Sequence, residues 1–144
     1  METILPVLIA ITASARQEDG QDEPMGMLTS GTLKLDGGRA VLSYEETLDE
    51  SLPPQPVEVT VEGDTVSMSR SGAFETSMVF CKGRRFEGQY RTPLGEMELA
   101  VYCTRLKADI GAEGGDILLG YQLDLNGQFA SMNELELRVM PQNE

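Results

Sequence analysis

Glu46 and Arg70 are the two charged residues whose positions suggest chemistry. Each extends a row of alternate residues that is otherwise apolar or aromatic, Glu46 after Tyr44 and Arg70 after Met68. Because alternate residues of a β-strand point to the same face, both charged side chains should point inward. A carboxylate and a guanidinium inside a protein need partners. We therefore expect Glu46 and Arg70 to form a partly buried ion pair.

This polar cluster has two interpretations. Hydroxyls of Tyr44, Tyr90 and either Thr76 or Thr92 are placed to join the ion pair. In the first interpretation the cluster is a satisfied polar plug that fixes strand register, since breaking a buried pair costs about 3–5 kcal/mol. In the second, the guanidinium receives the carboxylate or phosphate of a small molecule. The ligand site predicted in that case comprises Tyr44, Glu46, Arg70, Tyr90, Met68, Met78 and Phe86, with Phe74 and Met97 as further apolar contacts.

Ten strand-like segments position these residues. Each alternates apolar and polar side chains, and turn signals such as Asp36-Gly37-Gly38 and Asn126-Gly127 separate them. No segment shows the pattern of a capped amphipathic helix. The predicted strands are 5–13, 25–35, 39–47, 57–62, 65–71, 73–81, 85–92, 96–107, 116–125 and 128–140, and the predicted loops are 17–24, 48–56 and 109–115.

The number and spacing of these segments predict one all-β domain over residues 1–144. An open sheet of so many strands would leave two unpaired edges. A single closed antiparallel up-and-down β-barrel of about 8–10 strands avoids those edges, and we expect it in preference to a sandwich.

Several short runs of the sequence support the barrel through a resemblance. They are Ser43-Tyr44-Glu45-Glu46, Arg70-Ser71-Gly72, Thr76-Ser77-Met78-Val79-Phe80, the segment 90–99 (YRTPLGEMEL) and the segment 121–127 (YQLDLNG). In order and spacing they resemble the uncharacterised bacterial YwiB-like family from about residue 28 onward, while the first third of the chain departs from it. The resemblance implies a calycin-like, lipocalin-like barrel in small cytosolic proteins with no assigned activity, so no catalytic residue is carried over.

Composition excludes several classes of function. The formal charge of −13 would repel nucleic acid and anionic lipid headgroups, although residues 66–95 carry five of the eleven basic residues. Histidine is absent, which removes Ser-His-Asp and Cys-His catalysis and most zinc, copper and non-haem iron sites. We expect no catalytic residues, no metal site, no cofactor, no nucleic-acid partner and no membrane partner.

The two cysteines and the N-terminus bear on location. Cys81 and Cys103 have no CxxC spacing, so we expect reduced thiols in a cytoplasmic protein, with a bridge between neighbouring strands as the alternative. The apolar run before Ala13-Ser14-Ala15 looks like a secretory signal. It lacks a basic start and contains Pro6, so we interpret it as the first strand.

Three classes of function are compatible with these observations. The first is a barrel that binds a small amphipathic or anionic molecule near Arg70. The second is a structural or protein-interaction module, such as a homodimer, whose barrel core is filled. The third, which we expect least, is an enzyme that uses Tyr, Glu and Arg without a cofactor.

Overall fold

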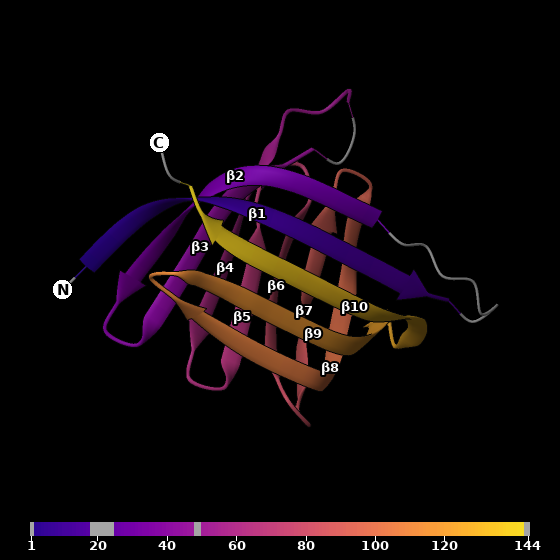
Figure 1. Ribbon diagram of the computed structural model, residues 1–144. Coiled ribbons are helices and arrows are strands. Elements are labelled where there is room, and N and C mark those ends of the chain that lie inside the picture. The colour runs from indigo at the N-terminus through magenta and orange to yellow at the C-terminus, as the bar shows by residue number, and fades with distance from the viewer. Residues whose placement is uncertain (1, 18–24, 48–49, 143–144) are drawn as a thin grey trace.

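The computed structural model describes residues 2–17, 25–47 and 50–142, and these form a closed antiparallel barrel of ten strands (Figure 1). The expected all-β barrel is confirmed. The long strands β1, β8, β9 and β10 lie on one side of the barrel and the shorter strands β3 to β7 on the other. The strands are β1 (Glu2–Arg16), β2 (Met25–Asp36), β3 (Arg39–Glu46), β4 (Gln55–Glu62), β5 (Thr65–Arg70), β6 (Glu75–Cys81), β7 (Arg85–Thr92), β8 (Gly95–Gly111), β9 (Gly114–Leu125) and β10 (Gln128–Pro141).

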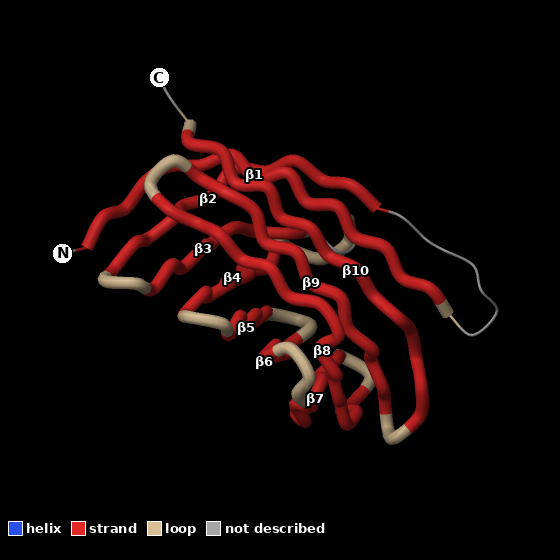
Figure 2. Tube along the Cα trace, turned by 60° about the horizontal axis from the view of Figure 1, so that its bottom comes forward, coloured by secondary structure: helices blue, strands red, loops and turns tan. Residues whose placement is uncertain are grey.

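The topology is up-and-down. Each strand pairs with the next in sequence, and β1 closes the barrel by pairing with both β2 and β10. Figure 2 shows the same path, in which turns and short connections join the strands. Because strand directions alternate, the connections 71–74, 93–94 and 126–127 gather at one end of the barrel. We call this the Arg70 end.

The first strand confirms the interpretation of the N-terminal apolar run. Val7, Ile9 and Ile11 are buried, as their alternation predicts, and β1 pairs with β10 from Val7↔Pro141 to Arg16↔Met132. No helix in the described part of the chain is long and apolar enough to cross a bilayer. The predicted loop 17–24 falls outside the described residues except for Gln17.

Nine of the ten strands supply fully buried side chains to the core of the barrel. β7 contributes only partly buried side chains, whereas each of the other nine strands supplies at least one residue to a single buried cluster. Burial of this apolar surface supplies the main stabilisation of the fold. The buried cluster contains Val7, Ile9, Ile11, Leu33, Ala40, Leu42, Tyr44, Val57, Val59, Val66, Met68, Met78, Phe80, Leu99, Val101, Cys103, Ile117, Leu119, Leu137 and Val139.

The hairpin turns confirm the predictions made from glycine and asparagine. Gly37 and Gly38 have φ of 51° and 84°, and Asn126 and Gly127 have φ of 52° and 77°. Two successive positive φ values are the signature of the two-residue turn that matches strand twist.

Three predicted boundaries are wrong. Residues 109–115 are not a loop: β8 runs to Gly111 and β9 begins at Gly114, since Ile110 continues the inward row of β8. Gln55 and Pro56 belong to β4, where they pair with Glu46 and Glu45. Pro56 is tolerated because it lies near the first residue of the strand. Strand β6 begins at Glu75, so Phe74 lies in the β5–β6 connection.

The barrel wall has irregular places that alternation does not reveal. A bulge between Cys103 and Arg105 shifts the phase of β8, and a second lies between Phe129 and Ser131 in β10. Strands β6 and β7 share only the pairs Glu75↔Arg91 and Thr76↔Tyr90. Strands β2 and β3 stop pairing at Gly31↔Tyr44, although both continue beyond that point.

Candidate functional site

Strand register places the predicted polar residues in one row across the inner wall. Tyr44 lies opposite Val57, Val57 opposite Arg70, Arg70 opposite Thr76, and Thr76 opposite Tyr90. All five belong to inward rows at the Arg70 end. The row therefore brings two tyrosines, a threonine and the guanidinium of Arg70 onto neighbouring strands.

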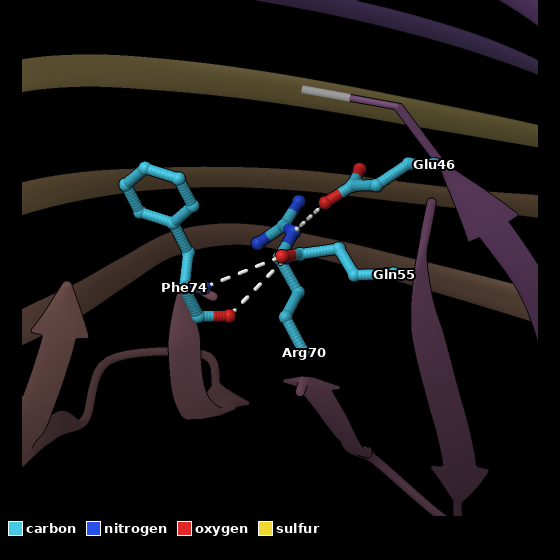
Figure 3. Close-up of polar contacts among 4 residues, drawn as sticks. All are labelled: Glu46, Gln55, Arg70 and Phe74. Atoms are coloured by element: carbon cyan, nitrogen blue, oxygen red, sulfur yellow. Dashed lines mark hydrogen bonds and ion pairs between the residues drawn. The ribbon is translucent and has the colours of Figure 1, made fainter. Parts of the chain in front are cut away.

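The predicted ion pair between Glu46 and Arg70 is present. Arg70 Nε donates a hydrogen bond to Glu46 Oε1 at 2.5 Å, and the side chains are 25% and 13% exposed (Figure 3). Glu46 projects from β3 and Arg70 from β5, so the ion pair passes over β4. The pair is half-buried at the barrel mouth, where desolvation is incomplete and water limits its strength.

The predicted bridging by hydroxyl groups is wrong. Among the described residues, neither the Tyr44 nor the Tyr90 hydroxyl forms a hydrogen bond to the ion pair. The Thr92 hydroxyl instead donates to Gly95 O at 3.0 Å and accepts from Leu94 N at 3.1 Å, which closes the β7–β8 turn. Thr92 is thus committed to local structure, because its hydroxyl satisfies a turn.

Gln55 is a further member of the cluster, and the sequence analysis missed it. Its side chain is buried, and its amide holds the main chain of Phe74 at both ends (Figure 3). Gln55 Nε2 donates to Phe74 O at 3.2 Å, and Phe74 N donates to Gln55 Oε1 at 3.3 Å. Gly72, with φ of 121°, lets the connection pass close over this side chain. Gln55 therefore fixes the connection that follows Arg70.

Burial and the charge of Arg70 set the protonation of two phenols. Burial raises the pKa of Tyr44 to about 12, the Arg70 charge opposes this rise, and Glu46 adds to it. Burial also raises the pKa of Tyr121, again opposed by Arg70. Because both pKa values are raised, both phenols are neutral at physiological pH. Tyr121 was predicted to point inward but not to belong to this cluster.

Residues 9–137 match the family described as "Domain of unknown function (DUF1934)". The chain belongs to this family. A crystal structure of the YwiB protein from Bacillus subtilis superposes with a TM-score of 0.86 at 23% sequence identity, over 97% of this chain and 94% of that one. No curated protein matches the sequence.

The family assignment confirms the resemblance seen in the sequence. At 23% identity, the likeness to YwiB supports the barrel fold and carries no activity. For this DUF1934 domain, the site has to be judged on its own geometry.

The residues predicted to form the apolar lining of the DUF1934 barrel do not lie together. Met68 and Met78 are opposite each other on β5 and β6 and are buried directly below the polar row. Phe86 packs partly buried against the core, four residues along β7 from Tyr90 and away from the Arg70 end. Phe74 and Tyr90 make a tilted ring pair with centroids 6.3 Å apart. The polar residues of the site therefore lie at the Arg70 end of the barrel, above a packed methionine layer.

Arg70 has hydrogen-bond donors that could bind a ligand. Only Nε is used for Glu46, and the structure gives the two terminal nitrogens no partner among the described residues. An arginine fork can bind a carboxylate or phosphate through two parallel hydrogen bonds. The described residues contain no group of three His, Cys, Asp or Glu side chains arranged to hold a metal ion.

Proposed function

We propose that this domain binds a small anionic or amphipathic molecule at the mouth of its barrel, with Arg70 as the receptor for the anionic group. The observation that supports this most directly is the divided use of the guanidinium. Nε is held by Glu46, while the terminal nitrogens are available on a side chain that is 25% exposed. Glu46 thereby orients the fork without occupying it.

The packed interior determines how such a ligand would lie. Met68 and Met78 fill the space below Arg70, so the apolar part of the ligand would rest on Phe74 and Tyr90 at the mouth. Deeper entry would require the two methionines to change rotamer, which this flexible side chain does more readily than a branched one. Tyr44, Glu46, Arg70, Tyr90, Met68 and Met78 form the proposed site, and Phe86 would be reached only by the deepest ligand.

A second function is favoured by the same packing. A barrel whose interior is filled by twenty buried residues resembles a structural or protein-interaction module, and a homodimer is one form of it. In that case the Glu46–Arg70 pair is a polar plug that holds strand register. The oligomeric state measured by analytical ultracentrifugation tests the homodimer directly.

A cytoplasmic location is part of the proposal. It is supported by Cys81 and Cys103, which are both free thiols. The net charge of −13 supports small ligands rather than nucleic acid as partners.

The proposal can be tested by native mass spectrometry and by ligand titration. We expect protein purified from its own cells to retain a small anion, and the apo protein to bind decanoate in calorimetry. Arg70→Met should abolish both, whereas Arg138→Met, which removes an equal charge from an exposed ion pair with Asp116, should abolish neither. An empty wild-type protein that also ignores decanoate would contradict ligand binding and favour the polar plug.

A further inference from the structure

The separation of β2 from β3 leaves an edge in an otherwise closed wall. The β2–β3 ladder runs from Asp36↔Arg39 to Gly31↔Tyr44 and stops there. Residues 25–30 of β2 continue as a strand that is paired only with β1. Residues 45–46 of β3 likewise pair only with β4. The barrel therefore has an open seam at the Arg70 end, next to the ligand site proposed above, since Glu46 belongs to the β3 edge of the seam.

The main-chain groups along this seam have a defined direction. In a two-residue hairpin, Asp36 and Arg39 form a hydrogen-bonded pair, and such pairs alternate along an antiparallel ladder. The even-numbered residues of β2 therefore direct their N–H and C=O groups toward β3. Beyond Gly31, these groups belong to Ser30, Leu28 and Gly26, and no described residue pairs with them through its main chain. The Thr29 hydroxyl donates a long hydrogen bond, 3.4 Å, to Ser30 O, so this carbonyl has a side-chain partner but no main-chain partner among the described residues.

An open groove of about 830 Å³ lies along the seam. Leu8 and Leu28 supply apolar side chains on the β1–β2 side, and Leu28 is 64% exposed. Glu45 and Glu58 supply carboxylates on the β3–β4 side, and neither forms an ion pair with a described residue. Ser43 of β3 and Ser69 of β5 also line the groove. The groove thus combines unpaired strand edge, apolar contact and negative charge.

We propose that this groove receives an extended segment of a partner protein, which adds to β2 as a further strand and carries alternating apolar and basic side chains. Strand addition satisfies the main-chain groups of Ser30, Leu28 and Gly26 through the same hydrogen bonds that a neighbouring strand would provide. Alternate side chains of a strand point to opposite faces, so the lysines or arginines of the segment lie on the outer face with Glu45 and Glu58, where their methylene stems contact Leu28. Its apolar residues point to the inner face, beside Met27.

Charge distinguishes this occupant from a second copy of the chain. Two copies would each bring a net charge of −13, and the groove itself contributes two unpaired carboxylates. Association of like-charged surfaces is opposed, whereas a basic segment is attracted and its encounter is accelerated. A basic partner therefore fits the groove better than self-association does.

The test uses the full chain and a synthetic peptide of alternating valine and lysine residues, with an alternating valine and glutamate peptide as control. We expect the lysine peptide to bind and to slow hydrogen exchange at the Leu28 and Ser30 amides. Thr32, which is already paired with Ser43, is the internal reference and should not change. The glutamate peptide should not bind.

Variants separate the groove from general charge effects. Changing both Glu45 and Glu58 to lysine should weaken binding of the lysine peptide about tenfold and reduce its salt dependence. Changing both Glu134 and Glu136 on β10 to lysine makes the same change in charge away from the groove, and this matched control should have a smaller effect. Because exchange is measured on the wild-type protein, the test stands even if a variant folds poorly.

Three results would overturn the proposal. One is the absence of lysine-peptide binding. Another is binding that leaves the Leu28 and Ser30 amides unprotected, which would place the peptide elsewhere. The third is protection of these amides before any peptide is added, which would mean that a second copy or another segment of this chain already covers the edge.

Discussion

Glu46 and Arg70 join two strands that share no main-chain hydrogen bonds. They are 24 positions apart in sequence, and strand β4 lies between their strands, yet Arg70 Nε and Glu46 Oε1 are 2.5 Å apart. A contact of this kind restrains the relative register of three neighbouring strands. The same contact uses Nε of the guanidinium and leaves its terminal nitrogens without a partner among the described residues. Structural and binding roles therefore meet in one residue, Arg70, and experiments must separate them.

Removing one partner of this pair should cost more stability while the other partner is present than when the other partner is already absent. Complete burial would make the loss about 3–5 kcal/mol, but this pair is partly exposed, so we expect about 2 kcal/mol for Glu46→Gln or for Arg70→Met. The double variant should lose less than the sum of the two single losses. Urea denaturation of the four proteins measures this coupling. Strictly additive losses would show that the pair contributes nothing as a pair.

Gln55 should prove necessary for the order of the β5–β6 connection. Gln55→Ala removes two hydrogen bonds to the Phe74 main chain and leaves polar groups of the connection without them. We expect a loss of about 1–3 kcal/mol in the free energy of unfolding. Hydrogen exchange at the Phe74 amide should accelerate as well. Gln89→Ala, at an exposed position of β7, is the matched control, and an equal effect from both variants would refute this role.

Alternation in the sequence was sufficient to predict the strands, the barrel and the inward direction of Glu46 and Arg70. These features depend on local pattern, since side-chain direction within a strand has a period of two residues. Gln55 carried the same signal, because it extends the inward row of Val57 and Val59 by one step. The prolines beside it concealed that signal by suggesting a loop.

Contacts between strands could not be predicted in the same way. The electrostatic effect of Arg70 on the pKa of Tyr121 depends on barrel closure, and the partners of a strand's residues depend on register. The bulge between Cys103 and Arg105 contains no glycine or proline within β8, and it changes the phase for the rest of that strand. Gly120, which lies opposite it on β9, can be recognised as its partner only once the register is known. The early end of the β2–β3 ladder likewise follows from the three-dimensional path of β2.

Stability should fall at high pH because of Tyr44. The folded-state pKa is about 12, whereas an unfolded tyrosine ionises near pH 10, so the unfolded chain releases this proton first. The contribution is therefore complete below pH 10 and is lost as the pH rises toward 12. It amounts to about 1.4 kcal/mol for each pH unit within that window.

Tyr44→Phe provides the control for this dependence. Urea denaturation between pH 8 and 12 should show a shallower decline for the variant than for the wild type. Tyr121, whose pKa is also raised by burial, should contribute in the same direction. Identical pH profiles for the variant and the wild type would contradict the assignment to Tyr44.

Gly31 should be the least replaceable glycine of β2, because it lies where the ladder to β3 ends. A Cβ at this position would overlap the Ser43 carbonyl oxygen and lie 2.9 Å from Ile9 Cδ1. The carbonyl belongs to the paired main chain and cannot move aside without disturbing the ladder. We expect Gly31→Ala to cost about 3 kcal/mol.

Gly26→Ala is the matched control for this prediction. It lies in the same strand, and a Cβ there would come no closer than 3.9 Å to any neighbouring atom, Ile11 O. Replacing a glycine in an unstrained conformation reduces the entropy of the unfolded chain, so this variant should be unchanged or more stable by up to about 1 kcal/mol. Thermal and urea denaturation compare the two variants. Equal stability would mean that β2 and β3 do not approach closely at Gly31, and the seam would then begin nearer the Asp36 turn.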